Sequence, residues 1–355
     1  MIKKINFILD AYGNSGGDQV VNNYSELFNK RGIDTVIYIP LIPYLYEGTF
    51  KEKILRIKRF FGHIYHYLIR GEVKKKYGKY RYKIVLLINN IFVRDADVSI
   101  ATAWPTSFDV VKLNKKKGKK FYFVQDYEIW SNQKLGKKSY ELPLKKITIS
   151  SWIKDMINKQ GIKDNIEIVF NGINAEMYDN KKEIINKKEM NCLMLAHNLE
   201  KKGCIDGLKA FEMARKKNKN LKLTMFGIQK LKFKTPEYVQ FVENPSRNEI
   251  INLYAKNDIF IFPSKAEGWG LTVVEAMASK CAVVATNSGC IIDIGENEEN
   301  CLISRPGDVI SLSNNILKLS ENYDLRKKIS ENGYTTVKKL KWEKSVDKFL
   351  KILND

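Results

Sequence analysis

The fold is decided by residues 258–287, which spell DIFIFPSKAEGWGLTVVEAMASKCAVVATN. The apolar run over 258–264 predicts a buried parallel strand, and the run over 281–286 predicts a second one. Between them the pattern predicts a glycine-rich turn followed by a short helix over 271–279. Such a turn directs the unpaired N–H groups of the helix N-terminus toward the edge of a sheet, where an anion such as a diphosphate binds favourably.

Two carboxylates flank this turn. Glu267 precedes Gly268 and Gly270, and Glu275 follows eight residues later in the predicted helix. Glutamates at this spacing occur by chance in a chain with 28% charged residues, and most of them are solvated. Here, however, the first glutamate lies at the carboxyl end of a predicted strand, which is where open α/β sheets bind ligands. The position therefore favours a binding-site role over a surface role.

Length and composition limit the function classes. The chain has 355 residues, typical of about two domains, and 44% of them are hydrophobic, enough for two cores. The formal net charge of +21 indicates an anionic partner, which is nucleic acid, an acidic membrane surface or a phosphorylated small molecule. Five cysteines without C-x-x-C pairing are typical of a reduced protein. With neither a signal peptide nor a run of roughly 18 apolar residues, we expect a cytoplasmic protein that is at most peripheral to a membrane.

Strands and helices alternate in two blocks, which predicts two doubly wound parallel sheets. The other predicted strands are 4–9, 35–39, 97–101, 121–124, 147–151, 166–170, 191–195, 221–226 and 238–242. The other predicted helices are 18–30, 205–217, 247–255, 308–320, 323–334 and 342–353. The polar stretch 174–190 predicts a linker. We therefore expect domains over 1–175 and 176–340, with the C-terminal helix in 341–355 packing back towards the first domain.

The first strand, the turn AYGNSGG (11–17) and the helix after it open a βαβ unit. The turn does not fit the dinucleotide pattern G-x-G-x-x-G, so it is either a phosphate cradle or a turn shaped by sterics alone. After the strand over 121–124, Asp126 and Glu128 are either site residues or surface residues. The D-x-D sequence at 95–97 is a metal-binding pattern, but it precedes a strand instead of following one, which disfavours a metal site.

Residues 51–83 are the most basic part of the chain, with twelve Lys or Arg against two Glu. Five apolar residues recur here at helical spacing: Ile54, Ile57, Phe61, Ile64 and Leu68. A cationic amphipathic helix can lie on an anionic membrane, whereas an ordinary domain helix shows only a solvated basic face, and both interpretations stay open. Nucleic-acid binding is a third interpretation, which no recognised motif accompanies.

Five motifs, in the expected order, resemble retaining family-4 glycosyltransferases, which have the two-domain GT-B fold. FPSKAEGWGLTVVE (262–275) is similar to the E-x7-E motif of the family, and SGGDQVVNNYSELFNKRG (15–32) is similar to its glycine loop and first helix. FNGIN (170–174) resembles P-N-G-V-D, and HNLEKKG (197–203) stands where the family has its diphosphate clamp, R-x4-K-G. YFVQDYE (122–128) looks closest to the branch that makes bacterial surface polysaccharides, including rhamnosyltransferases and hexosyltransferases.

The resemblance implies two Rossmann-like domains facing a central cleft, and a retaining transfer that needs neither metal nor cofactor. The donor would be a UDP- or dTDP-sugar and the acceptor a lipid-linked glycan or surface polysaccharide, reached at an anionic membrane surface. The catalytic residues implied are Glu267, Asp126 and Lys202, of which Lys202 matches the lysine of the clamp. The donor-binding residues implied are Gly16, Gly17, His197, Lys202, Gly227, Asn244, Glu267, Gly268, Trp269, Gly270, Leu271 and Glu275.

Particular roles follow from the same resemblance. Glu267 would hold hydroxyls of the transferred sugar, Glu275 would accept hydrogen bonds from the ribose, and Asp126 would meet the acceptor. His197 stands in place of the clamp arginine, and a neutral imidazole donates one hydrogen bond where a guanidinium offers a charged fork. This difference motivates a second hypothesis, a catalytically silent partner that binds a nucleotide sugar or glycan beside another glycosyltransferase.

Overall fold

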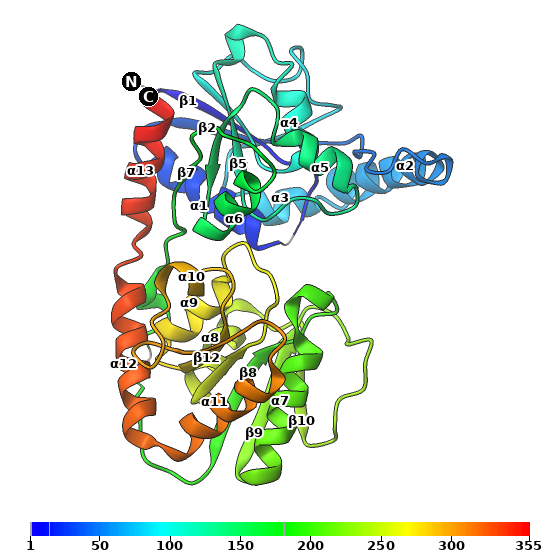
Figure 1. Cartoon of the computed structure of the whole chain (residues 1–355). Coiled ribbons are helices and arrows are strands. Elements are labelled where there is room, and N and C mark those ends of the chain that lie inside the picture. Colours follow the sequence, from blue (N-terminus) through cyan, green and yellow to red (C-terminus); the bar gives the residue numbers. More distant parts are fainter. Residues whose placement is uncertain (1, 14, 180–181) are drawn as a thin grey trace. The chain divides into compact units, whose positions relative to one another are not determined.

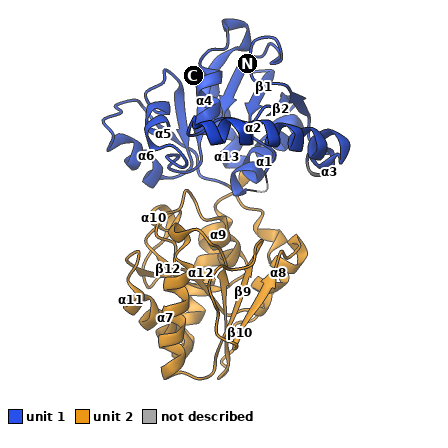
Figure 2. Ribbon diagram, turned by 90° about the vertical axis from the view of Figure 1, so that its right-hand side faces the viewer, with its two compact units in different colours: residues 1–171, 343–355 blue, residues 172–342 orange. Residues whose placement is uncertain are grey.

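The computed structural model describes residues 2–13, 15–179 and 182–355, which form two compact units (Figures 1 and 2). The first unit comprises residues 1–171 and 343–355, and the second comprises residues 172–342. Each unit is built on one parallel sheet with helices on its faces, so the predicted fold class, α/β with two Rossmann-like sheets, is confirmed.

The sheet of the first unit has seven strands in the order β3-β2-β1-β4-β5-β6-β7. Their bounds are β1 Lys4–Ile8, β2 Asp34–Pro40, β3 Tyr82–Val85, β4 Val98–Ala101, β5 Lys119–Val124, β6 Lys145–Thr148 and β7 Glu167–Ile168. The strand order reverses between β1 and β4, which places the switch point of the sheet, where open α/β folds bind ligands, at the carboxyl ends of these two strands.

Helices cover the sheet of the first unit, and the C-terminal helix of the chain packs on the aromatic core of this unit. Their bounds are α1 Gly16–Lys30, α2 Phe50–His63, the π-helix η1 Ile64–Ile69, α3 Glu72–Tyr77, α4 Trp104–Val110, the short 3-10 turn η2 Lys115–Lys117, α5 Gln133–Ser139, α6 Ser151–Asn158 and α13 Trp342–Asn354. From α13, Phe349 places its ring centroid 4.8 Å from that of Tyr24 and 5.1 Å from that of Phe123. The C-terminal helix therefore contributes a buried side chain to this core.

The sheet of the second unit has six strands in the order β10-β9-β8-β11-β12-β13, again with one reversal, between β8 and β11. Their bounds are β8 Met190–Leu195, β9 Leu221–Gly227, β10 Val239–Glu243, β11 Ile259–Phe262, β12 Ala282–Thr286 and β13 Leu302–Ser304. The helices are η3 Ala175–Met177, η4 Glu200–Lys202, α7 Cys204–Lys217, α8 Arg247–Lys256, α9 Leu271–Ala278, α10 Ile291–Ile294, α11 Val309–Glu321 and α12 Tyr323–Lys338.

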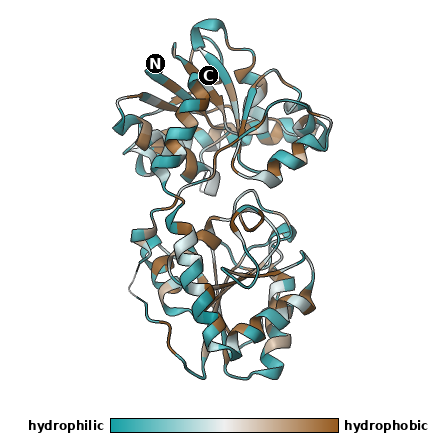
Figure 3. Ribbon diagram, turned by 60° about the vertical axis from the view of Figure 1, so that its left-hand side comes forward, coloured by the Kyte–Doolittle hydropathy of each residue, from teal (hydrophilic) through white to brown (hydrophobic). Residues whose placement is uncertain are grey.

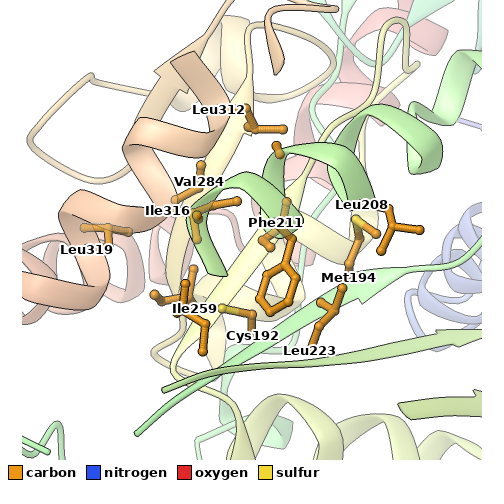
Figure 4. Packing of buried hydrophobic residues seen from close by; sticks show 14 of the residues in the cluster. Cys192, Met194, Leu208, Phe211, Leu223, Ile259, Val284, Leu312, Ile316 and Leu319 are labelled. Carbon is orange, nitrogen blue, oxygen red and sulfur yellow. The ribbon is translucent and has the colours of Figure 1, made fainter. Parts of the chain in front are cut away.

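The core of the second unit lies between this sheet and the helices α7 and α11 (Figure 4). Phe211 from α7 and Ile316 from α11 are fully buried against strand residues such as Cys192, Leu223 and Val284. Figure 3 shows the same division in colour, with largely hydrophobic strands inside and helices whose residues alternate between hydrophilic and hydrophobic. This alternation is what allows each helix to cover the sheet with one side and meet water with the other.

All five cysteines of the chain lie among the described residues, and each is buried and free. Burial raises the pKa of every one of these thiols: Cys192, Cys204, Cys281, Cys290 and Cys301. None of the described helices has the length and apolar character needed to cross a membrane.

The helices and strands that were predicted are present, with ends shifted by a few residues. Two strands at the edges of the fold were not predicted, β3 and β13. The predicted linker over 174–190 includes Tyr178, which is buried, so its first turn is part of the second unit. Residues 180 and 181 of that prediction lie outside the described residues.

Candidate active site

The loops that follow β8 and β11 meet at the switch point of the second sheet. Lys202 lies in the first loop and Glu267 in the second, and the Lys202 Nζ is 2.5 Å from the Glu267 Oε2. Both side chains are largely shielded from water, with 17% and 16% of their surfaces exposed. The structure therefore brings together two of the three residues predicted as catalytic, from positions 65 residues apart in the chain.

The two loops are also joined through their backbones. The N–H groups of Lys265 and Ala266 donate to the Lys201 carbonyl oxygen, at 2.7 and 3.3 Å. Gly203 has a φ of +62°, and a Cβ at this position would lie 2.0 Å from the carbonyl oxygen of Pro263. Only glycine fits this approach, so the loop that carries Lys202 is fixed against the end of β11.

His197 is neutral in its surroundings. Its Nδ1 accepts the backbone N–H of Leu199 at 3.0 Å, which leaves Nε2 to carry the ring proton. Burial, and next the positive charge of Lys202, lower the pKa of His197 below its ordinary value of 6.5. His197 is thus a neutral single donor near Lys202 and Glu267.

The turn that carries Gly268, Trp269 and Gly270 leads directly into α9, whose first residue is Leu271. Gly270 precedes the helix with a φ of +97°, a backbone conformation that side-chain-bearing residues rarely adopt. Its α-carbon lies beside Glu267, since a Cβ built there would be 3.6 Å from the Glu267 Cγ. The N-terminus of α9, with its partial positive charge, therefore lies next to Glu267 and its partner Lys202.

Glu275 lies in α9 in a buried network of hydrogen bonds. Its Oε1 accepts from the Tyr178 hydroxyl and the Arg247 guanidinium, each at 2.8 Å. Its Oε2 accepts from the Tyr254 hydroxyl at 3.1 Å. A carboxylate has about four acceptor positions, so three of them are filled and one remains on Oε2. Tyr178, Arg247 and Tyr254 were not singled out in the sequence, because their roles arise only from contacts across the fold.

Gly227 and Asn244, both predicted to bind the donor, lie at the ends of the neighbouring strands β9 and β10. The Asn244 N–H donates to the Gly227 carbonyl oxygen at 2.6 Å. Asn198, which follows β8, donates to the Lys230 carbonyl at 3.0 Å and accepts the Lys232 N–H at 2.8 Å. The loops after β8, β9 and β10 therefore form one hydrogen-bonded rim at the carboxyl edge of the sheet.

In the first unit, the switch point is lined by carboxylates. Asp10 follows β1, and burial, with a further contribution from the charge of Asp18, raises the pKa of Asp10 to about 6. Asp18 forms a capping box with Ser15 at the start of α1. The turn predicted as either a phosphate cradle or a steric turn thus places two acidic groups near its glycines, which disfavours a phosphate there.

Gly16 and Gly17 begin α1, and Gly17 lies against the side chain of Gln125 at the end of β5. The Gln125 Oε1 is buried and has no hydrogen-bond partner among the described residues. An unpaired buried acceptor is costly, and a hydroxyl of a ligand would satisfy it. Asp126, next in the chain, accepts the Tyr127 N–H at 2.9 Å and is partly exposed.

Glu128 is not a surface residue, which was one of its two predicted roles. It is 4% exposed, and its Oε2 accepts the Tyr122 hydroxyl at 2.5 Å. Burial raises the pKa of Glu128 to about 8, so the carboxyl keeps its proton at neutral pH. Its burial and this hydrogen bond make it a structural partner of Tyr122.

An aromatic cluster at the same switch point was not predicted. Tyr46 and Trp130 come from the loops after β2 and β5, and Trp104 is the first residue of α4, which follows β4. Their centroids lie 5.9 Å (Tyr46–Trp104), 5.3 Å (Tyr46–Trp130) and 5.8 Å (Trp104–Trp130) apart. Trp130 is 37% exposed, while the Trp104 Nε1 is buried without a partner among the described residues. The cluster combines an apolar platform with one unsatisfied polar atom, features that ligand-binding pockets share.

The D-x-D pattern has structural partners. Asp95 pairs with Lys117 at 2.8 Å, and Asp97 accepts the backbone N–H groups of Lys3 and Lys4 at 2.7 and 2.8 Å. Among the described residues, no group of three or more His, Cys, Asp or Glu side chains is placed to hold a metal ion.

Two sheets in Rossmann order, each with polar residues at its switch point, define a protein of the GT-B fold. Over its full length the chain is similar to a variant of Staphylococcus aureus TarM in complex with fondaparinux, alpha-GlcNAc-glycerol and UDP. The TM-score is 0.72 at 14% identity, with 100% of both chains covered. At this identity the likeness shows the fold alone.

Residues 176–336, nearly the whole second unit, match the family described as Glycosyl transferases group 1. An uncharacterized glycosyltransferase of Methanocaldococcus jannaschii is 29% identical over 212 residues, which are 56% of each chain. The capsular polysaccharide biosynthesis glycosyltransferase CapM of Staphylococcus aureus is 29% identical over 140 residues, which are 37% of each chain. The chain thus matches only about half the length of the first of these curated relatives, 56%.

Proposed function

We propose that the protein transfers a sugar, with retention of anomeric configuration, from a UDP- or dTDP-sugar to a lipid-linked glycan in the assembly of a bacterial surface polysaccharide. The observation that carries the proposal is that Lys202 pairs with Glu267 next to the N-terminus of α9. A cation and a helix N-terminus at a switch point form a site for a diphosphate.

The chemistry follows from the charge that develops. When the bond between the anomeric carbon and the phosphate oxygen breaks, the electron pair stays on the diphosphate. Lys202 and the N–H groups at Gly268–Leu271 stabilise that charge in a partly desolvated site, where such interactions are strong. In this proposal no metal is needed for the leaving group.

Glu267 has two roles in succession. Its carboxylate pairs with Lys202 and so orients the ammonium group. When the diphosphate takes over Lys202, the carboxylate is released to accept hydrogen bonds from hydroxyls of the transferred sugar. The ribose is assigned to the free acceptor position on Glu275 Oε2.

The acceptor is assigned to the switch point of the first unit. Trp130 and Tyr46 offer apolar faces for a sugar ring, and the buried Gln125 Oε1 offers an acceptor for one of its hydroxyls. Asp126, whose carboxylate lies at the end of β5, would accept the hydrogen bond of the attacking hydroxyl. Bacterial surface polysaccharide is proposed from the sequence resemblance and the likeness to CapM.

The test uses the purified chain. A thermal-shift panel of UDP- and dTDP-sugars first identifies the donor, since a bound ligand raises the unfolding temperature by mass action. The donor is then incubated with detergent-dispersed lipid-linked glycans, and release of nucleoside diphosphate and the anomeric configuration of the product are measured by NMR. An inverted product would refute retention, and the absence of any shift with both donor classes would refute the donor assignment.

A second candidate function is favoured by one observation, the neutral His197 in place of a cationic clamp residue. It is the silent partner that binds a nucleotide sugar or glycan without transferring it. A donor that raises the unfolding temperature but is neither hydrolysed nor transferred by the purified chain would support this candidate.

A further inference from the structure

Helix α2 turns its apolar side away from the protein. Along one stripe, Phe50, Ile54, Ile57 and Phe61 are spaced four, three and four residues apart, which places them on the same side of an α-helix. They are 79%, 55%, 61% and 63% exposed, respectively. A helix that helps to build a core does the opposite and buries its apolar stripe.

The opposite side of α2 faces the first unit through polar contacts. Glu52 is buried, and its carboxylate accepts the backbone N–H groups of Tyr46, Glu47 and Gly48 at 2.6 to 2.8 Å. Further along the helix, the Arg56 Nε donates to the Pro43 carbonyl oxygen at 2.7 Å, and the His63 Nδ1 lies 2.8 Å from the Leu41 carbonyl oxygen. These contacts hold the helix in one rotation, so the outward direction of the stripe is fixed by the fold.

The apolar stripe continues beyond α2. In η1, Leu68 is 53% exposed and Ile69 is 72% exposed. Isolated exposed apolar residues are ordinary, but a row that runs along consecutive turns of one helix marks an interaction surface.

Cations flank the stripe. Lys51, Lys53 and Lys58 are exposed on α2. The one acidic residue of α2, Glu52, is turned inward and held by the backbone. Long lysine side chains beside an apolar stripe can place their charges at the level of lipid headgroups while their stems lie against the acyl chains. The outer side of this helix is therefore apolar and cationic without a compensating carboxylate on α2.

We propose that α2 is an in-plane membrane anchor, which inserts the side chains of Ile54, Ile57 and Phe61 between the headgroups of an anionic bilayer while the flanking lysines bind the lipid phosphates. The sequence left a membrane helix and an ordinary domain helix open, and the outward stripe favours the membrane helix. Charge complementarity points to anionic lipid as the partner of this surface. Each lysine near an anionic bilayer raises the membrane affinity about fivefold. The proposed anchor determines whether the chain binds a membrane, and it does not depend on the proposed transfer reaction.

The experiment is co-sedimentation of the full chain with vesicles of phosphatidylcholine, with and without phosphatidylglycerol. We expect binding to the anionic vesicles that weakens as salt rises, and at least tenfold weaker binding to phosphatidylcholine alone. The double variant Ile57→Asp/Phe61→Asp should lose at least tenfold in affinity for the anionic vesicles. The matched control is Ile310→Asp, because Ile310 is equally exposed at 64% but lies on α11 of the second unit. It should bind as the unaltered chain does.

Two outcomes would overturn the anchor. One is equal vesicle binding by the double variant and the unaltered chain. The other is a dimer in the absence of lipid that the double variant dissociates, since the stripe would then be an interface between two copies. Donor-induced thermal shifts are measured in parallel on the same proteins. Because α2 lies outside the proposed donor site, the two measurements test separate proposals. Loss of vesicle binding with a normal donor-induced shift would bear on the anchor alone, and loss of the shift with normal vesicle binding would bear on the proposed function alone.

Discussion

Replacing Lys202 with Met removes the cation from the proposed diphosphate site while keeping an unbranched side chain. In the structure this ammonium group is the charged donor paired with Glu267, beside the N–H groups of α9. We therefore expect the variant to lose mainly transition-state stabilisation, because the charge on the leaving diphosphate is greatest when the sugar bond is breaking.

The magnitude follows from comparable donors in other enzymes. Removing one preorganised donor to a developing oxyanion costs about 10²- to 10³-fold in kcat, or about 2.7–4 kcal/mol. The same change leaves the Glu267 carboxylate unpaired at 16% exposure, so it also costs folding stability. For a pair that is neither fully buried nor at the surface we expect about 1–3 kcal/mol, between the values of the two extremes.

The assay is steady-state release of nucleoside diphosphate, combined with calorimetric titration of the donor and thermal unfolding. Lys201→Met is the matched control, because the Lys201 backbone carbonyl, which the substitution keeps, is what holds the second loop. The double variant Lys202→Met/Glu267→Gln separates the two effects, since it should recover stability but not activity. A Lys202→Met enzyme with kcat within threefold of the unaltered chain would refute the assignment of Lys202 to the diphosphate.

Three further predictions concern other residues. The pKa of His197 is lowered below 6.5, so the imidazole is neutral at pH 7, and its protonation at lower pH adds a second cation. Calorimetry should therefore show that a nucleotide sugar binds more tightly on acidification to the unaltered chain but not to His197→Gln. Identical pH profiles for the two proteins would contradict this prediction. Because the pKa of Glu128 is raised from 4.5 to about 8, its contribution to stability is complete below pH 4.5 and is lost as the pH rises to about 8. In Glu128→Gln the free energy of unfolding by urea should lack this decline, which has a limiting slope of about 1.4 kcal/mol per pH unit, and parallel curves would contradict the buried neutral carboxyl. Trp130→Ala should raise the KM for the glycan acceptor about three- to tenfold, because stacking on an aromatic ring contributes about 0.5–1.5 kcal/mol. The Kd of the donor should stay unchanged. An unchanged KM would show that Trp130 does not contact the acceptor.

The fold could be predicted well because most strands are compact apolar runs between turns. The two exceptions have physical reasons. β3, Tyr82–Val85, carries a lysine within a strongly basic segment, and β13, Leu302–Ser304, has only three residues. At the edge of a sheet a strand needs little apolar sequence of its own, because its hydrogen bonds to one neighbour define it.

The site could be predicted only in part. Lys202 and Glu267 were found because short motifs place them after adjacent strands, and the structure brings their charged groups together. The partners of Glu275 could not be found in this way, since Tyr178 lies 97 residues away in the chain. We therefore expect Glu275→Ala to destabilise the fold, because the change would leave a guanidinium and two tyrosine hydroxyls without their acceptor.

Helix α2 shows a different limit of sequence analysis. The period of its apolar residues predicts a stripe, but a period contains no information on which way the stripe faces. That direction is set by Glu52, whose carboxylate binds three backbone N–H groups of the preceding loop. Burial disfavours the charge of Glu52, but these hydrogen bonds together lower its pKa, so the carboxylate stays ionised and the contact persists at neutral pH.

The burial of all five thiols makes the chain a convenient host for spectroscopic labels. A single cysteine introduced on the outer side of α2 would be the sole thiol open to a maleimide dye or a nitroxide reagent, without prior removal of the native ones. A fluorophore or spin probe attached there would report the polarity and depth of its surroundings directly, residue by residue along the helix.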